Sequence, residues 1–252
     1  ALLKVESIYG QTILRALITP RVAKGQLFAP MHWTRQRSSQ GTVNSVVAPV
    51  TDPFSGQPAL KSGAVSAIIY KPKWYAFLAS QTQPTPQTPY AAIAKTQSGW
   101  QAELASRKMP NDWEEELRKL SGLTDGDIAI QADPTAGKIR MALTQAGRIT
   151  GLFFVSPTPI VLSRTTIVGL IGTDIPPLVA LAGQSRADQP DVGPTVCACF
   201  NVGRNTLLSA AANGARSVTA LGDVTFAGTN CGSCKPELRT LLARAQLPMA
   251  AE

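Results

Sequence analysis

Hydrophobic and polar residues alternate along much of the first 72 residues, and this period of two predicts β-strands. The longest run alternates around Gly10, and three shorter runs follow it. Proline, glycine, serine and aspartate are concentrated between the last two runs, where they favour turns. The first block is therefore expected to form a β-barrel-like domain, with its strands in residues 4–19, 26–30, 41–47 and 63–70.

The middle of the chain mixes helix signals with strand signals. Ser98 is a candidate cap for a short helix that extends to Lys108. Asn111 and Glu114 form a capping-box-like pair before a second helix, which Gly122 is expected to end. These signals predict two helices in the first half of this block.

The second half of the middle block predicts three strands and two more helices. The strands are expected over residues 127–133, 138–144 and 148–156, with short hairpin-like connections between them. The helices are expected near residues 162–171 and 175–183. Residues 73–183 are thus predicted to form an α+β unit, in which the Pro/Thr/Gln-rich residues 81–89 are an extended loop.

Residues 183–194 are polar, contain proline and glycine and lack aromatic side chains, which is typical of a linker between domains. The remaining residues, 195–252, predict three helices. Asn201 is expected to cap the first, Gly222 to end the second, and Pro236 to lie in the first turn of the third. The third helix has its apolar residues on one face: Leu238, Leu241, Leu242 and Ala245.

Charge is distributed unevenly over these blocks. The net charge of the chain is +8, of which residues 1–72 carry +6, with 8 basic and 2 acidic side chains. A basic block suits an anionic partner. Nucleic acid is not expected as that partner, because no nucleic-acid-binding motif accompanies the charge. No apolar run is long enough to span a bilayer and no secretory signal is visible, so a cytoplasmic fragment that begins inside a domain is expected.

All four cysteines lie in the C-terminal block, as Cys197-Ala-Cys199 and Cys231-Gly-Ser-Cys234. Two close pairs of thiolates can hold a 2Fe–2S cluster, with helices between the pairs to bring them together. A structural zinc ion with four thiolates is a chemical alternative. A thioredoxin-type redox pair is disfavoured, because the C-x-x-C lacks a βαβ setting. The cysteine pattern therefore predicts a metal site.

The segment from Val196 to Leu242 resembles the helical 2Fe–2S domain of bacterioferritin-associated ferredoxin, through its C-x-C, its C-x-x-C and the flanking G-T-N-C-G-S-C-x-P-E loop. The resemblance implies that Cys197, Cys199, Cys231 and Cys234 bind a 2Fe–2S cluster. Because this module occurs in several oxidoreductases, it implies electron transfer rather than one reaction. Gly193, Gly228 and Gly232 are expected to let the backbone approach the sulfides closely.

A second resemblance lies in the first block, in Pro30-Met31-His32-Trp33, Asn44 and the segment from Asp52 to Lys61. These residues look like the C-terminal dinucleotide-binding domain of molybdopterin oxidoreductases, which is a double-psi β-barrel. The resemblance implies contacts with the cofactor by four residues: His32, Trp33, Asn44 and Lys61. A packed His–Trp pair, a structural asparagine and a solvated lysine explain the same residues without a ligand.

Together the two motifs are similar to the C-terminal part of a bacterial assimilatory nitrate reductase catalytic subunit. The implied fold class is an α+β multidomain protein, with a partial double-psi β-barrel (1–72), an α+β middle unit (73–183) and a small all-α 2Fe–2S-binding domain (195–252). The implied cofactors of the complete enzyme are the 2Fe–2S cluster, molybdenum bis(molybdopterin guanine dinucleotide) and a 4Fe–4S cluster held upstream. Nitrate is the implied substrate of that enzyme.

No catalytic residue is assigned to this chain, because the resemblance puts the molybdenum-ligating part upstream and His32 is the only histidine. The implied partner is an electron-donor flavoprotein or ferredoxin. Four basic residues are candidates to steer it, or are ordinary solvated charges: Arg204, Arg216, Lys235 and Arg239. The alternatives are a ferredoxin-like carrier or adaptor without catalysis of its own, and another oxidoreductase, such as a nitrite reductase, that uses the same cluster module.

Overall fold

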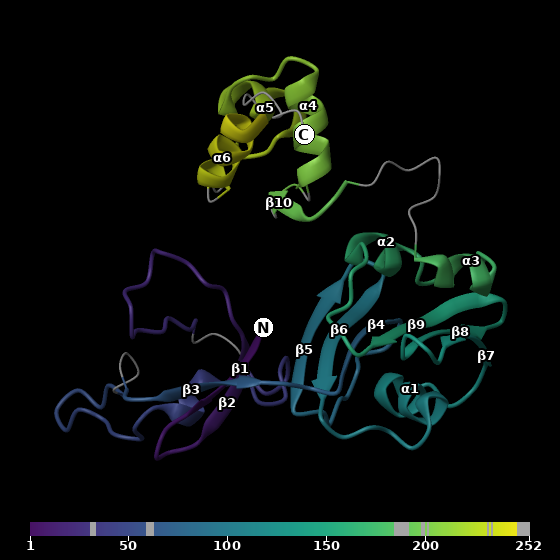
Figure 1. The fold of residues 1–252 in the computed structure, drawn as a ribbon, viewed down its shortest axis with the longest axis horizontal. Helices are drawn as coiled ribbons and strands as arrows, with labels where there is room; N and C mark the ends of the chain where they lie inside the picture. The colour runs from purple at the N-terminus through teal and green to yellow at the C-terminus, as the bar shows by residue number, and fades with distance from the viewer. Residues whose placement is uncertain are drawn as a thin grey trace. The chain divides into compact units, whose positions relative to one another are not determined.

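The computed structural model describes residues 1–30, 34–58, 63–183, 192–197, 200, 202–230, 232 and 234–245. The chain divides into two compact units, Ala1–Gly183 and Gln184–Glu252 (Figure 1). Sheets dominate the first unit and helices the second. The expected α+β fold class is therefore confirmed in its broad form.

A three-stranded antiparallel sheet opens the first unit, with the order β2-β1-β3. The strands are β1 (Leu2–Glu6), β2 (Gln11–Arg15) and β3 (Ser66–Tyr70). Gly10 lies in the turn between the first two, where its carbonyl oxygen accepts a hydrogen bond from the Ser7 amide at 2.9 Å. The strand β2 falls inside the first segment that the alternating pattern marks and β3 inside the last, whereas β1 begins at Leu2, before the first segment starts.

The prediction of two further strands between these segments, over residues 26–30 and 41–47, is wrong. Residues 26–30 form no strand, and Leu27 and Phe28 in that segment are exposed. Residues 41–47 contain a short 3₁₀ helix, η1 (Val43–Val46), in place of a strand. The Ser45 hydroxyl donates to the carbonyl oxygen of Thr42 at 2.7 Å, and such a local side-chain bond competes with strand pairing.

The larger part of the first unit is a six-stranded antiparallel sheet in the order β5-β6-β4-β9-β8-β7. Its last three strands, β7 (Asp127–Asp133), β8 (Lys138–Gln145) and β9 (Arg148–Ser156), match the three predicted strands. Its first two, β4 (Trp74–Ser80) and β5 (Tyr90–Thr96), were not predicted from the pattern. The loop 81–89 joins β4 to β5, so it connects two strands of the same sheet.

The helix expected from Ser98 to Lys108 is wrong, because these residues form β6 (Gly99–Ser106). The strand pairs with β4 on one side and with β5 on the other. Ala102 and Leu104 are buried on either side of the partly exposed Glu103, and the strand ends in three buried residues, Leu104 to Ser106. Pairing on both edges and this burial outweigh the helix propensity of Gln-Ala-Glu-Leu-Ala.

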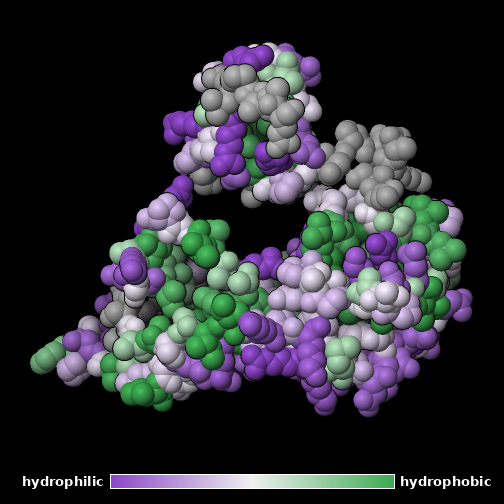
Figure 2. Space-filling model, viewed as in Figure 1, coloured by the Kyte–Doolittle hydropathy of each residue, from purple (hydrophilic) through white to green (hydrophobic). Residues whose placement is uncertain are grey.

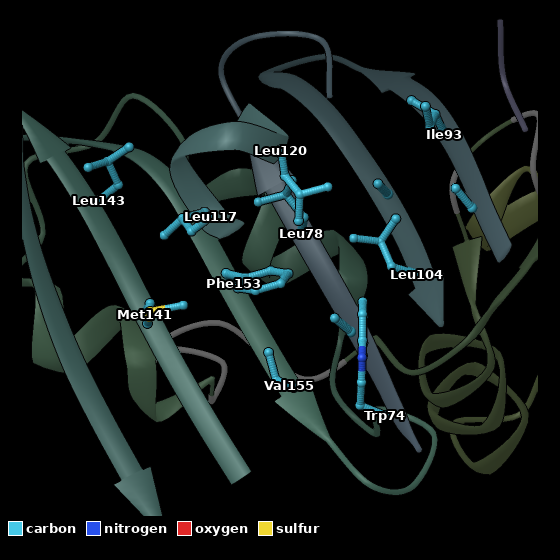
Figure 3. Close-up of a cluster of buried hydrophobic side chains, with 13 residues drawn as sticks. Trp74, Leu78, Ile93, Leu104, Leu117, Leu120, Met141, Leu143, Phe153 and Val155 are labelled. Atoms are coloured by element: carbon cyan, nitrogen blue, oxygen red, sulfur yellow. The ribbon is translucent and has the colours of Figure 1, made fainter. Parts of the chain in front are cut away.

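One face of the six-stranded sheet is covered by α1 (Trp113–Ser121). Figure 3 shows Leu117 and Leu120 of this helix directed towards Leu78 and Phe153 on the sheet. The N-cap is Asp112, not the predicted Asn111: its Oδ1 accepts from the amides of Glu114 at 2.7 Å and Glu115 at 3.1 Å.

The opposite face of the sheet packs on two short helices, α2 (Arg164–Gly169) and α3 (Pro177–Ala182). Successive residues of β4 point to opposite faces of the sheet. Leu78 packs in the cluster beneath α1, and Phe77 packs in the cluster beneath α2 and α3. Both helices and the end of α1 at Gly122, which has a φ of 68°, are as predicted. This unit therefore has two hydrophobic layers around one sheet.

The three-stranded sheet is joined to the larger sheet by a small apolar cluster and an ionic bridge. Ile13 and Tyr70 pack with Tyr90 and Ala105 of the larger sheet. Glu103 of β6 accepts from Arg164 at 2.8 Å and pairs with Arg15 of β2 at 3.5 Å. A half-buried carboxylate between two guanidinium groups thus links the N-terminal sheet to α2.

In its described residues, the second unit has three helices and a two-stranded ladder: β10 (Thr195–Cys197), β11 (Val202–Gly203), α4 (Arg204–Ala212), α5 (Val218–Thr225) and α6 (Lys235–Ala245). One apolar cluster lies among the helices and includes Leu207, Leu221 and Leu238. The predicted buried face of the last helix is confirmed for Leu238, Leu241 and Leu242.

Two helix boundaries in this unit differ from the prediction. Gly203 is the N-cap of α4, and the predicted cap, Asn201, lies outside the described residues. The helix α5 continues past Gly222 and ends at Phe226, which adopts the left-handed conformation with a φ of 61°. Gly222 is buried, and a Cβ there would lie 3.0 Å from the methyl group of Thr229. It is a packing position rather than a helix stop.

Among the helices of the described segments, none combines the length and apolar character that crossing a membrane requires.

Replacement of Phe153 by alanine is expected to lower the free energy of unfolding by about 3–5 kcal/mol, because it empties the centre of the α1 core. Phe153 is 0% exposed, and its ring lies 6.1 Å from that of Trp113. Denaturant titration followed by tryptophan fluorescence measures the change. Phe54→Ala is the matched control, since Phe54 is 98% exposed. Equal stabilities of the two variants would contradict this account of the core.

Candidate metal centre

Two of the four predicted metal ligands meet in the core of the second unit. Cys197 ends β10 and Cys234 directly precedes α6. Neither is in a disulfide, they are only 2% and 7% exposed, and their side chains interact with each other by hydrogen bonding. Residues 37 positions apart in the sequence are thus placed together in an apolar environment.

The electrostatics of this pair disfavours loss of its protons. The pKa of the Cys234 thiol is raised above its usual range, mainly because burial penalises the thiolate, and also because Cys197 is a neighbour that can become negative. A bound metal cation reverses this balance, since it pairs with thiolate charge and displaces the protons. The chemistry of the donor pair therefore fits a cation that binds thiolates.

A glycine loop brings a backbone donor to the Cys234 sulfur. The amide of Gly228 hydrogen-bonds to this sulfur and favours its thiolate form. Gly228 has a φ of 82°, and a Cβ there would lie 3.2 Å from Leu238 Cδ1 and 3.3 Å from Lys235 Cγ. Both the conformation and the lack of space therefore require glycine at this position.

On the opposite side of the site, the backbone before Cys197 is fastened to the start of α4. The Arg204 amide donates to the carbonyl oxygen of Pro194 at 2.8 Å, and the Asn205 amide donates to that of Val192 at 3.0 Å. A Cβ on Gly203 would overlap the carbonyl oxygen of Val192. Sequence reasoning missed Gly203, because its closeness to Val192 is a contact between separate backbone segments that the local pattern does not reveal.

The other predicted site residues fall into two groups. Five lie outside the described residues: Cys199, Cys231, His32, Trp33 and Lys61. Asn44 is exposed on η1. In the segments that the structure describes, no group of three or more His, Cys, Asp and Glu side chains has a metal-binding arrangement. The described part of the metal centre is thus the pair Cys197 and Cys234.

Comparison with known families places two cofactor domains in this chain. Residues 195–244 match the family of BFD-like 2Fe-2S binding domains. Residues 1–64 match the Molydopterin dinucleotide binding domain family. The chain is 31% identical over 258 residues to a nitrate reductase of Klebsiella oxytoca, an alignment that covers 96% of this chain. Nearly all of this chain is therefore similar to a part of a nitrate reductase.

The recognition made from the motifs is therefore confirmed, as are the 2Fe–2S and molybdopterin dinucleotide cofactor classes of its two domains. The nitrate-reductase-like chain spans 28% of the length of the Klebsiella oxytoca relative. No solved structure matches it.

Gly228→Ala is expected to destabilise the second unit by about 1–3 kcal/mol more than Gly214→Ala does, because overpacking adds to backbone strain. Both glycines have positive φ values, 82° and 107°, but nothing lies within 4 Å of a Cβ at Gly214. Thermal unfolding of the full chain, followed by circular dichroism, compares the two variants. Equal melting temperatures would show that the close contacts with Leu238 and Lys235 do not add to the destabilisation caused by alanine at position 228.

Proposed function

We propose that this chain is the part of a molybdenum-dependent nitrate reductase that closes the bis(molybdopterin guanine dinucleotide) site and accepts electrons through a 2Fe–2S cluster. The complete enzyme reduces nitrate to nitrite in the cytoplasm. The observation that carries the proposal is the meeting of Cys197 and Cys234 in a chain that also matches a molybdopterin dinucleotide-binding family. The similarity to a nitrate reductase supports the same oxidoreductase class.

We assign three domains: the dinucleotide-binding domain (1–72), the middle unit (73–183) and the small helical cluster domain (195–252). The sheet β1–β3 is proposed to be part of a larger double-psi barrel. Large apolar side chains near it support this, because Leu17, Ile18 and Phe28 are more than 80% exposed. Figure 2 shows hydrophobic surface on this N-terminal part of the chain. Exposed patches of this kind mark surfaces that pack against something else.

The proposed cofactor contacts in the first domain are His32, Trp33, Asn44 and Lys61. An imidazole N–H, an indole face, a carboxamide and an ammonium group suit the pterin, guanine and phosphate parts of the cofactor. The exposure of Asn44 leaves its carboxamide accessible to a ligand. The net charge of +6 over residues 1–72 supports binding of a ligand with several phosphates.

In the helical domain, four thiolates are proposed to hold the 2Fe–2S cluster: Cys197, Cys199, Cys231 and Cys234. When bound, the cluster supplies one-electron transfer. The chain's own residues shape its surroundings: the apolar cluster around Leu207 and Leu238 excludes water, and the Gly228 amide donates to one sulfur. Hydrogen bonds to the sulfurs and limited solvent exposure are among the features that set the potential of such clusters.

The proposed donor is an acidic flavoprotein or ferredoxin, and the electrons continue to a 4Fe–4S cluster and to molybdenum in the upstream part of the enzyme. Four basic residues are proposed to steer the donor, and all are exposed: Arg204, Arg216, Lys235 and Arg239. Within the described part of the second unit, no ion pair neutralises them. Unpaired surface charge of one sign raises the rate of association with an oppositely charged partner.

Metal and sulfide analysis of the anaerobically purified chain tests the proposal. About two iron and two acid-labile sulfide per chain are expected, with an EPR signal after reduction. Each of four single variants is expected to lose this signal: Cys197→Ser, Cys199→Ser, Cys231→Ser and Cys234→Ser. Asp223→Asn, an exposed carboxylate in the same unit, is the control and keeps the iron. Stoichiometric zinc without sulfide, even after reconstitution with iron and sulfide, would refute the electron-transfer role.

A further inference from the structure

The side chain of Lys235 lies across the glycine loop that leads to Cys231. Lys235 is the first residue of α6 and follows Cys234 directly. A Cβ on Gly228 would lie 3.3 Å from its Cγ, and a Cβ on Gly232 would lie 3.7 Å from its Cδ and 3.9 Å from its Nζ. The residue as a whole is exposed, but its stem passes close to Gly228 and Gly232. Its ammonium group therefore lies near Gly232, one of the two residues between the cysteines of the C-x-x-C motif.

Among the residues that the structure describes, no carboxylate forms an ion pair with this ammonium group. The ion pairs in the described residues all lie within residues 4–164, in the first unit. In the described part of the second unit the acidic residues are Asp223 and Glu237, and neither lies within salt-bridge distance of Lys235. A positive charge close to Gly232, without a counter-ion among the described residues, is available to an anion bound by the cysteines that flank this position in the sequence.

We propose that Lys235 raises the reduction potential of the 2Fe–2S cluster; this rests on the function proposed above. Four thiolates and two sulfides outweigh two ferric ions, so the cluster is anionic before reduction. Reduction adds one electron and no atom: one ferric ion becomes ferrous, and the electron comes from the donor protein. Because the negative charge grows, a neighbouring ammonium group stabilises the reduced form more than the oxidised form.

The position of Lys235 distinguishes it from the other basic residues of the unit. Arg239 lies on the same helix, four residues further on, which is about 6 Å along the axis. Like Lys235 it is exposed, but it is absent from the atoms that approach Gly228 and Gly232. Coulomb energy falls with distance. Lys235 is therefore expected to influence the cluster more than Arg239 does.

The test is a redox titration of the full chain with dithionite and mediator dyes, followed by EPR, so that no donor protein takes part. In Lys235→Met the stem over the glycines is retained and the charge is removed. This variant is expected to lower the equilibrium constant for reduction about tenfold, a fall of about 59 mV for a one-electron couple. Lys235→Arg, which keeps the charge, and Arg239→Met, which removes a charge elsewhere on the helix, are expected to stay near the parent.

An unchanged potential in Lys235→Met, or an equal fall in Arg239→Met, would overturn the role of Lys235 and leave the proposed function standing. A parent chain that holds zinc and no sulfide would overturn both. Lys235→Gln is the second neutral variant, used if Lys235→Met does not load. Failure of both neutral variants to hold iron, with full loading of Lys235→Arg, would support the same electrostatic role. Failure of Lys235→Arg as well would refute it.

Discussion

Two buried thiols, Cys197 and Cys234, set the main constraint on the C-terminal unit. Both sit in an apolar core, and each has the other as its neighbour; burial there raises the pKa of the Cys234 thiol. The surrounding backbone is arranged around this contact: Gly228 donates to one sulfur, and the segment before Cys197 is bonded to the start of α4. A core of this size is small for independent stability, so binding energy from a metal adds directly to the stability of the fold.

The first unit follows a different principle, because its order comes from packing on both faces of one sheet. The alternation along β4 directs Leu78 and Phe77 to opposite layers, and helices close both layers. The three-stranded sheet is attached to this framework through Glu103, which contacts guanidinium groups from β2 and α2. The segment that matches the dinucleotide-binding family is therefore in direct contact with the larger sheet, through this ion pair and the apolar cluster around Tyr90.

The sequence predicted the features that depend on short-range chemistry. The strands between Asp127 and Ser156 are separated by short turns, and the last helix has an apolar face, so both were visible in the pattern. The cysteine spacing pointed to a metal site, and Cys197 and Cys234 do meet.

Features that depend on distant partners were missed. Residues 99–106 have the composition of a helix, but β4 and β5 pair with them from both sides. Gly222 looks like a helix stop, yet its lack of a side chain makes room for Thr229. The close approach of Gly203 to Val192 depends on a contact between backbone segments that no local pattern records.

That same contact decides how much polypeptide the small domain needs if it is to be excised and moved to another host protein. The family match begins at residue 195, but Val192 and Pro194 accept hydrogen bonds from the first amides of α4. A boundary for excising the small domain therefore lies before Val192, within the predicted linker of residues 183–194. The last residues of this linker are part of the small domain's fold.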